Sequence, residues 1–181
     1  MKLYVTRHGQ TEFNVLHKIS GTTDVELTDK GKEQATRLAE LLADKKLDLI
    51  ISSPMKRAQD TAKAIALKCN VDILIDERLK EQDYVIYEGM DPKTPEFQSG
   101  RRHFALRCPQ GESKLQLAAR AYALLDDIKQ KYSDKTVLLV CHGGTCRVIH
   151  TYFHDMTNEE FFGFKMDNCG IQEYDFSAKD W

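Results

Sequence analysis

The sequence predicts an α/β layered fold built around a mostly parallel sheet. Short apolar runs of strand length alternate along the chain with longer segments of helical periodicity, which is the arrangement of strand–helix–strand units. Most of the short runs are apolar almost throughout. This composition favours parallel strands, because helices cover a parallel sheet on both of its faces.

The composition fits one domain over residues 1–181. At 181 residues and 41% hydrophobic, the chain is long enough to bury a sizeable core, and no linker divides it. A net charge of −2 without a Lys/Arg-rich block argues against a nucleic-acid partner. No apolar stretch approaches the roughly 18 residues of a membrane span, and the N-terminus lacks the hydrophobic region of a signal peptide. We therefore expect a cytoplasmic protein with no membrane partner.

The five cysteines are odd in number and scattered, which suits reduced thiols better than a disulfide framework. Cys141 and Cys146 form a C-x4-C pair, but a closed zinc site needs four ligands and no second pair is present. We expect small buried residues at these positions and no metal.

Five strands are expected. Four are apolar runs, at residues 2–6, 47–51, 71–75 and 136–140, and the last of these is the clearest because its apolar, β-branched character is uninterrupted. A fifth run, over residues 170–176, alternates less cleanly between apolar and polar side chains. It is predicted to be an edge strand.

Helices are expected between the strands, and four of them have a recognisable first residue. Thr28, Ser113 and Thr157 are of the type that caps a helix N-terminus, and Ser53 precedes a proline that suits the first helical position. The expected helices cover residues 29–43, the segment from Pro54 onward, residues 114–131, about 145–153, and a short stretch after Thr157.

Residues 84–111 interrupt this alternation. The segment holds three of the four prolines and has little periodicity. A stretch of this length inside a compact domain is usually a lid or a substrate-binding loop. We interpret it as a lid with some helix of its own.

Polar side chains follow each of the first four strands. In open parallel sheets, ligands bind outside the carboxyl ends of the strands, so these side chains are expected to converge at one edge. Each has an ordinary alternative role as a surface cation, a loop carboxylate or a core histidine, but their shared position favours a common site. The convergent residues are Arg7, His8, Arg57, Glu81 and His142.

This set of residue types suits phosphoryl transfer without a metal. Arginine offers a rigid fork of donors to a phosphate, and an imidazole can attack phosphorus to form a covalent intermediate. A carboxyl group beside a phosphate is favoured in its protonated form, which suits a general acid. The glycines after His8 and His142, among them Gly143, let the backbone approach a ligand closely.

The sequence also resembles the histidine phosphatase superfamily, the phosphoglycerate mutase-like proteins. Six motifs carry the resemblance in order along the chain: residues 5–14 (VTRHGQTEFN), Gly21 to Ala35, residues 52–62, residues 78–81, residues 111–113 and residues 142–144. The resemblance implies a three-layer α/β/α sandwich. It implies that His8 is the phosphorylated nucleophile, that Glu81 is the proton donor, and that Arg7, Asn14, Arg57 and His142 hold the phosphoryl group.

The sequence departs from the family pattern after the acid. Tyr84-Val85 stands where an aromatic residue and glycine are usual, and Tyr87-Glu88-Gly89 stands in place of Trp-Glu-Gly. Glu88 is therefore a reserve candidate for the acid if Glu81 points away. Cys141 replaces a residue that is frequently serine.

We expect a phosphomonoesterase of the histidine acid-phosphatase type that acts on a small phosphorylated metabolite without a cofactor. The alternatives are a phosphoglycerate mutase-type transferase and a catalytically inactive module that binds phosphorylated ligands. The physiological substrate and the oligomeric state stay open. Arg101, Arg102 or Arg107 in the lid would suit a second anionic group on the substrate, and the ordinary alternative is a solvated helix face.

Overall fold

The computed structural model describes residues 1–178 and contains one five-stranded sheet with the order β3-β2-β4-β1-β5. The pairs β1–β4, β2–β4 and β2–β3 are parallel, and β5 is antiparallel to β1 at the edge, as predicted for the fifth strand. The strands are β1 (Lys2–Arg7), β2 (Leu49–Ser52), β3 (Ile73–Ile75), β4 (Val137–Cys141) and β5 (Ile171–Asp175).

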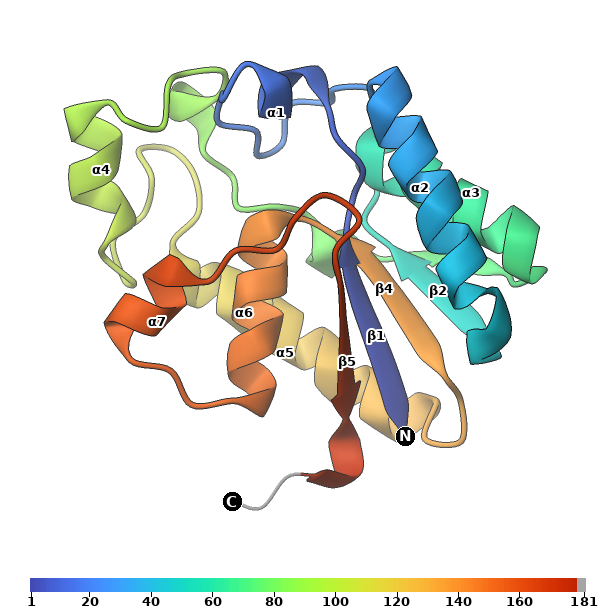
Figure 1. Ribbon diagram of the computed structural model, residues 1–181. Coiled ribbons are helices and arrows are strands. Elements are labelled where there is room, and N and C mark those ends of the chain that lie inside the picture. Colours follow the sequence, from blue (N-terminus) through green and yellow to red (C-terminus); the bar gives the residue numbers. More distant parts are fainter. Residues whose placement is uncertain (179–181) are drawn as a thin grey trace.

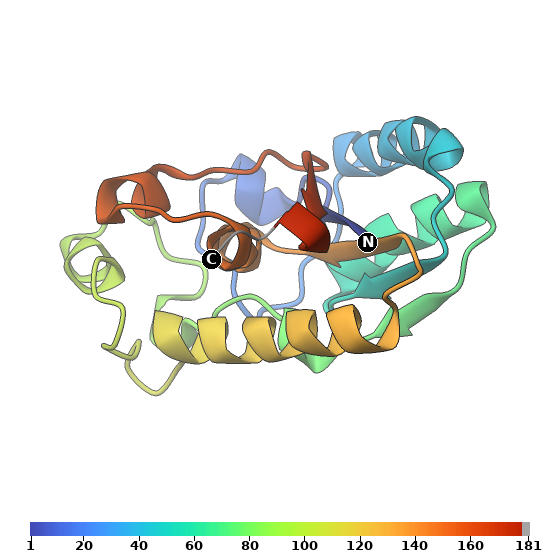
Figure 2. The same ribbon diagram turned by 90° about the horizontal axis from the view of Figure 1, so that it is seen from below.

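Helices cover both faces of this sheet, which makes three layers (Figures 1 and 2). On one face, α2 (Asp29–Leu42) and α3 (Lys56–Cys69) bury a cluster that includes Tyr4 and Ile50. On the other face, α5 (Lys114–Lys131) and α6 (Gly143–Phe153) bury a cluster that includes Leu3 and Val5. Successive side chains of β1 thus enter different cores, which is why the strand is apolar throughout. The predicted α/β/α layering is confirmed.

Two predicted helix starts were wrong. The helix α3 begins at Lys56 with Met55 at the N-cap, so Ser53 does not cap it and Pro54 lies before its first turn. The Ser53 hydroxyl is instead 2.7 Å from the Nε2 atom of His142. The helix α6 begins at Gly143 rather than Thr145. Both differences occur just after a strand. The side chains there, Ser53 and His142, bond to each other instead of capping the helix that follows.

Seven shorter elements complete the described chain. Residues 84–111, the segment interpreted as a lid, contain the 3₁₀ helix η3 and the helix α4, so the expected helix is present there. Val85 has a φ of +39°, a left-handed conformation that strains a β-branched residue and suits the glycine usual at this position. The shorter elements are α1 (Glu12–Val15), α4 (Pro95–Arg101), α7 (Asn158–Gly163), η1 (Ala43–Lys45), η2 (Glu77–Leu79), η3 (Val85–Tyr87) and η4 (Phe176–Ala178).

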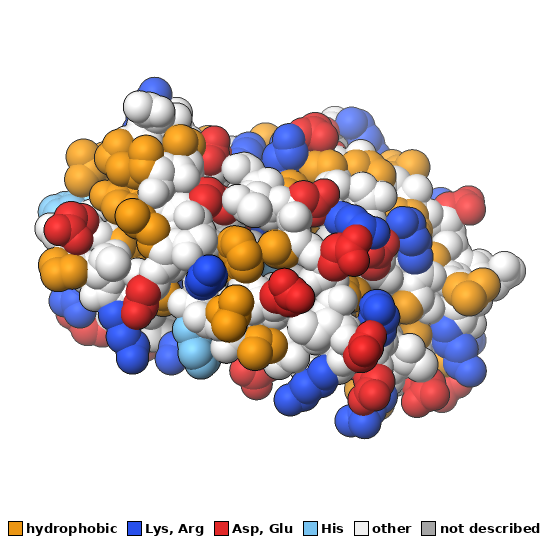
Figure 3. Space-filling view, turned by 90° about the horizontal axis from the view of Figure 1, so that it is seen from above, with side chains coloured by type: hydrophobic (Ala, Val, Ile, Leu, Met, Phe, Trp, Pro, Cys, Tyr) orange, Lys and Arg blue, Asp and Glu red, His pale blue; other side chains and the backbone are white. Residues whose placement is uncertain are grey.

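The carboxyl ends of the parallel strands point toward the edge that carries α1 and the lid, at the top of Figure 1. Seen from that side, acidic and basic side chains are interspersed, and hydrophobic side chains gather toward the lid end (Figure 3). Within residues 1–178, no helix is both long and apolar enough to cross a membrane.

Candidate active site

His8 follows β1 and lies almost entirely inside the molecule, with 3% of its surface exposed. Its Nδ1 atom is 2.7 Å from the carbonyl oxygen of Gly9. Because a carbonyl only accepts, Nδ1 carries the proton, and in the neutral ring the lone pair lies on Nε2. Burial, reinforced by the positive charges of Arg57 and Arg7, holds the pKa of His8 well below its ordinary value of 6.5. The imidazole of His8 is thus uncharged, as its predicted role of nucleophile requires.

His142 lies beside His8, with a distance of 5.2 Å between the two ring centres. Arg57 Nε donates to His142 Nδ1 over 3.2 Å, so His142 Nε2 carries the proton and donates to Ser53 Oγ. Burial, together with Arg57, also holds the pKa of His142 well below 6.5. The histidine is fixed in one tautomer by partners on both sides.

Arg57 is completely buried. Besides the bond to His142, it donates to the carbonyl oxygens of Gly21 and Thr23 over 2.6 and 2.8 Å. Arg57 and His142 were predicted to hold the phosphoryl group. In the structure, neither side chain lines the cavity, and at most 1% of either residue is exposed. Arg57 instead anchors the loop that contains Gly21 and Thr23. Its positive charge is also close enough to lower the pKa of His8.

Glu88 supports this same loop. Its carboxylate accepts hydrogen bonds from the backbone N–H groups of Gly21, Thr22 and Thr23, at 3.0 to 3.3 Å. It is not among the residues that line the main cavity, whereas Glu81 is. The reserve assignment of the acid to Glu88 is therefore not needed.

Arg7 and Asn14 face the cavity with unused donors. Arg7 Nη1 donates to the carbonyl of Met166, and its buried Nε has no partner among the described residues. Asn14 uses its amide oxygen for the Thr11 N–H and for Asn168, which leaves its own NH₂ group for a ligand. Both side chains present N–H groups of the kind that hold a phosphate.

Glu81 sits at the N-terminus of α6. Its carboxylate accepts hydrogen bonds from the N–H groups of Gly144 at 2.8 Å, Gln82 at 3.0 Å and Thr145 at 3.1 Å. A carboxylate is favoured at this end of a helix by the partial positive charge of the free N–H groups. The residue lines the same cavity as His8, so the predicted nucleophile and the predicted acid face one space.

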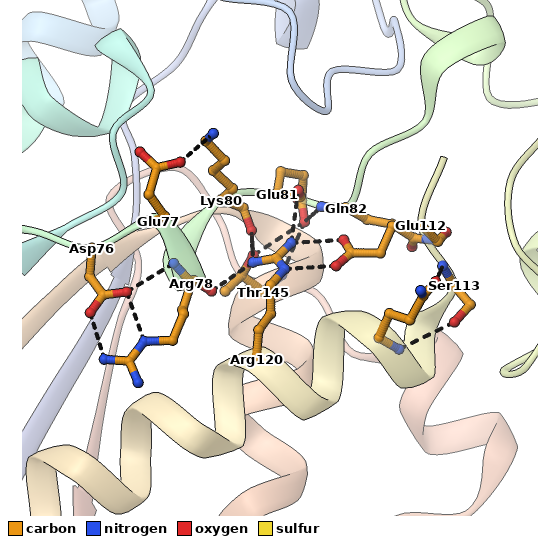
Figure 4. Close-up of polar contacts among 11 residues, drawn as sticks. Asp76, Glu77, Arg78, Lys80, Glu81, Gln82, Glu112, Ser113, Arg120 and Thr145 are labelled. Atoms are coloured by element: carbon orange, nitrogen blue, oxygen red, sulfur yellow. Dashed lines mark hydrogen bonds and ion pairs between the residues drawn. The ribbon is translucent and has the colours of Figure 1, made fainter. Parts of the chain in front are cut away.

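Arg120 on α5 fixes the backbone of the segment that carries Glu81 (Figure 4). Its guanidinium donates to the carbonyl oxygens of Arg78, Lys80 and Glu81, over 2.6 to 3.0 Å. Glu112 holds the same guanidinium in a two-bond ion pair at 2.7 and 2.8 Å. Glu112 of the motif at residues 111–113 thus holds the arginine that positions the Glu81 segment. The sequence did not predict this role for Arg120.

The main cavity has a volume of about 740 Å³, a size typical of small-molecule sites. Of the predicted residues, it is lined by Arg7, His8, Asn14, Glu81, Gly143, Arg101 and Arg107. Arg102 is exposed and does not line it, and Arg57 and His142 lie behind its wall. The lid segment contributes an aromatic wall in which Tyr84 and Tyr87 meet Phe97 edge to face.

Cys141 and Cys146 approach each other to 3.4 Å between sulfur atoms and are both fully buried. Burial raises the pKa of the Cys141 thiol well above its ordinary value. Over residues 1–178, no group of three or more His, Cys, Asp or Glu side chains is placed to hold a metal ion.

Asn168 was missed in the sequence. Its amide donates to the carbonyl of His8 at 2.9 Å and to Asn14 at 3.0 Å, although it lies some 150 residues away in the chain. No local pattern marks an asparagine in such a loop. Arg120 did leave a signal, because it is a charged residue three positions after the buried Leu117 and directly before the buried Ala121.

The tautomers described above predict a specific NMR result. At pH 6.5, His8 should be mainly neutral with its proton on Nδ1, and His142 should be neutral with its proton on Nε2. The reason is that burial and two arginines disfavour the imidazolium, so each pKa lies below 6.5. Side-chain ¹⁵N shifts across a pH titration measure both features. Half-protonation of His8 at or above pH 6.5 would contradict the description.

The two glycines that begin α6 predict a contrast between variants. A Cβ atom at Gly144 would lie 2.5 Å from Glu81 Oε1, whereas one at Gly143 would meet nothing closer than Arg7 Nε at 3.7 Å. Gly144→Ala should displace the carboxylate and lower kcat/KM for an alkyl phosphate on the order of 100-fold. Gly143→Ala should lower it far less. Equal losses in steady-state assays of the two variants would show that the position of Glu81 does not matter.

Comparison with known proteins gives a consistent result. The sequence matches the model of the histidine phosphatase superfamily (branch 1) over residues 3–181. A probable phosphoglycerate mutase GpmB of Escherichia fergusonii is 31% identical, and the one of an Enterobacter species is 32% identical. Each alignment covers 100% of this chain and 87% of the relative.

Solved structures agree with this. A phosphoserine phosphatase from Entamoeba histolytica, in complex with 3-phosphoglyceric acid, has a TM-score of 0.85 and 30% identity, covering 97% of this chain and 91% of that one. A mycobacterial glucosyl-3-phosphoglycerate phosphatase has a TM-score of 0.84 and 28% identity, covering 95% of this chain and 90% of that one.

Proposed function

The chain belongs to the histidine phosphatase superfamily (branch 1), and we propose that it is a metal-independent phosphomonoester hydrolase that acts through a phosphohistidine on a small phosphorylated metabolite. One observation carries the proposal. His8 is neutral and buried, its Nδ1 proton is held by Gly9, and it lines a cavity together with Arg7 and Glu81. An imidazole in this state has its nucleophilic lone pair on Nε2.

The reaction proceeds in two steps. Nε2 of His8 attacks phosphorus, the bond to the leaving oxygen breaks, and Glu81 gives its proton to that oxygen. Glu81, now ionised, then takes a proton from water, whose oxygen attacks phosphorus while the bond between phosphorus and His8 Nε2 breaks. Phosphate and free His8 are the products.

The surrounding donors stabilise the charge that develops on phosphorus. Arg7 lines the cavity and its Nη2 makes no hydrogen bond with any described residue, and Asn14 offers its amide NH₂. The buried charge of Arg57 disfavours the protonated imidazole of His8. His142 holds this arginine in position by accepting a hydrogen bond from its Nε. Preorganised donors of this kind are commonly the largest contribution to catalysis.

A mutase is the second candidate, because the curated relatives of Escherichia fergusonii and Enterobacter are named as probable phosphoglycerate mutases. The two functions differ in what takes the phosphoryl group from His8. In a hydrolase the acceptor is water, and in a mutase it is a hydroxyl group of the substrate. The phosphatase names of the solved structures favour water.

The experiment that tests the proposal measures phosphate release from a panel of phosphomonoesters in the presence of EDTA. Interconversion of 2- and 3-phosphoglycerate is followed in parallel by NMR. Phosphate release that survives EDTA supports the hydrolase. Interconversion that exceeds release would establish the mutase, and dependence of either activity on added metal would overturn the proposed chemistry.

A further inference from the structure

The cavity contains more positive charge than one phosphoryl group needs. Its lining includes seven Lys or Arg side chains against three Asp or Glu, whereas the whole chain has 26 against 28. Arg7 is one of the seven and lies beside His8. The remaining cations are not explained by the proposed hydrolysis.

Lys114 is the least expected of these cations. It is the first residue of α5 and is only 9% exposed, yet its ammonium group makes no hydrogen bond or ion pair with any residue from 1 to 178. Its ammonium group lies 5.9 Å from the ring centre of Phe162. A buried charge without a partner of opposite sign is costly and therefore calls for an explanation.

Arg147 lines the cavity as well and has no carboxylate partner among the described residues. Its Nε and Nη2 atoms both donate to the carbonyl of Phe164, at 3.3 and 3.1 Å, and its guanidinium lies 5.4 Å from the ring centre of Phe161. Nη1 makes no hydrogen bond within the described chain. Arg147 follows Gly143 by four residues on α6, so its backbone lies about one helical turn, roughly 5.4 Å, from the phosphoryl end of the cavity.

These cations influence one another. Burial lowers the pKa of Lys114 to about 8; Cys108 opposes this shift, and the charges of Arg147 and Arg101 add to it. Burial also lowers the pKa of Arg147, against the raising effects of Tyr84 and Glu81 and with a smaller lowering contribution from Arg101. All three positive side chains line the same cavity, and Lys114 and Arg147 lie over the rings of Phe162 and Phe161, whose centres are 5.1 Å apart. An anion bound there would relieve the repulsion among them.

We propose that Lys114, Arg147 and Arg101 form a second anion-binding subsite in the cavity. The inference rests on the proposed function, which places the phosphoryl group of the same substrate at His8. It narrows the substrate class to small phosphomonoesters that carry a carboxylate or a second phosphate within a few bonds of the ester. Of the lid arginines considered from the sequence, Arg101 belongs to this subsite and the exposed Arg102 does not.

The test uses binding, so that it does not depend on turnover. The probes are 2-hydroxy-4-phosphonobutanoate and 3,4-dihydroxybutylphosphonate, which differ only in having a carboxylate or a CH₂OH group. Calorimetry at pH 7 compares the parent with Lys114→Met. The parent should prefer the acid by about 10- to 100-fold, as for a hydrogen bond between charged groups, and the variant should lose most of that preference.

Lys18→Met is the matched control, because Lys18 also lines the cavity but is exposed. It removes the same charge and should keep the preference for the acid. Lys114→Met should unfold at no lower temperature than the parent, since it removes a buried charge whose pKa is already lowered. Propane-1,3-bisphosphonate as a third probe tells whether the subsite prefers a phosphate to a carboxylate.

Two results would overturn the subsite: equal binding of the acid and the alcohol by the parent, or equal loss of preference in both lysine variants. The latter would mean that the overall charge of the cavity, and not a built site, selects anions. Phosphate release from the panel of esters is assayed on the same protein. A preference for the acid without any release would refute the proposed hydrolysis and leave the subsite standing.

Discussion

His8→Ala is expected to abolish turnover, with kcat/KM falling by about 10⁴- to 10⁶-fold, as when a catalytic nucleophile is removed. The side chain supplies the Nε2 lone pair that attacks phosphorus, and the histidine packed against it cannot take over this role. His142 has both of its nitrogens engaged, with Arg57 and with Ser53. Phosphate release in the presence of EDTA measures the effect.

His103→Ala is the control for this variant, because His103 is exposed and does not line the cavity. It should behave as the parent does. Circular dichroism of His8→Ala checks that the fold is retained. A folded His8→Ala protein that keeps more than about one hundredth of the parent's activity would remove His8 from the mechanism, since such a loss is too small for a nucleophile.

Glu81→Gln is expected to have the second largest effect, and the effect should depend on the leaving group. For an alkyl phosphate, whose leaving oxygen needs a proton, kcat/KM should fall by about 10²- to 10⁴-fold. For p-nitrophenyl phosphate, whose leaving group p-nitrophenolate departs without a proton, the first step should remain fast. Hydrolysis of phospho-His8 should then be slow, because water has lost its base. Rapid mixing should show a burst of about one p-nitrophenol per active site.

Glu88→Gln separates a proton donor from a structural carboxylate. Glu88 holds the N–H groups of Gly21, Thr22 and Thr23, so its replacement should affect all leaving groups alike. A loss that depends on the leaving group in Glu88→Gln, and not in Glu81→Gln, would reverse the assignment of the acid.

The sequence predicted the layers and the edge of the sheet where the site lies, because both follow from local patterns. Apolar runs mark strands with two covered faces, and polar residues after successive parallel strands must meet. His8 and Glu81 were found in this way and share the cavity. The family resemblance added their roles, which position alone does not give.

The supporting contacts could not be predicted, since they join residues that are distant in the chain. Asn168 reaches His8 from the loop before β5, and Arg120 reaches the Glu81 segment from α5. The burial of Arg57 was also missed. In a helical pattern an arginine is usually a surface cation. Arg57 is satisfied in the interior by His142 and by the carbonyl oxygens of Gly21 and Thr23, which come from other segments of the chain.

The most direct test of the mechanism is to trap the covalent intermediate. Glu81→Gln is mixed with p-nitrophenyl phosphate in EDTA, quenched within the burst under alkaline conditions that preserve phosphohistidine, digested and examined by mass spectrometry. The account predicts one phosphoryl group on His8 in the peptide that contains it, and none in a variant that also carries His8→Ala. A phosphoryl group on another residue, or a burst without any phosphorylated peptide, would contradict the account.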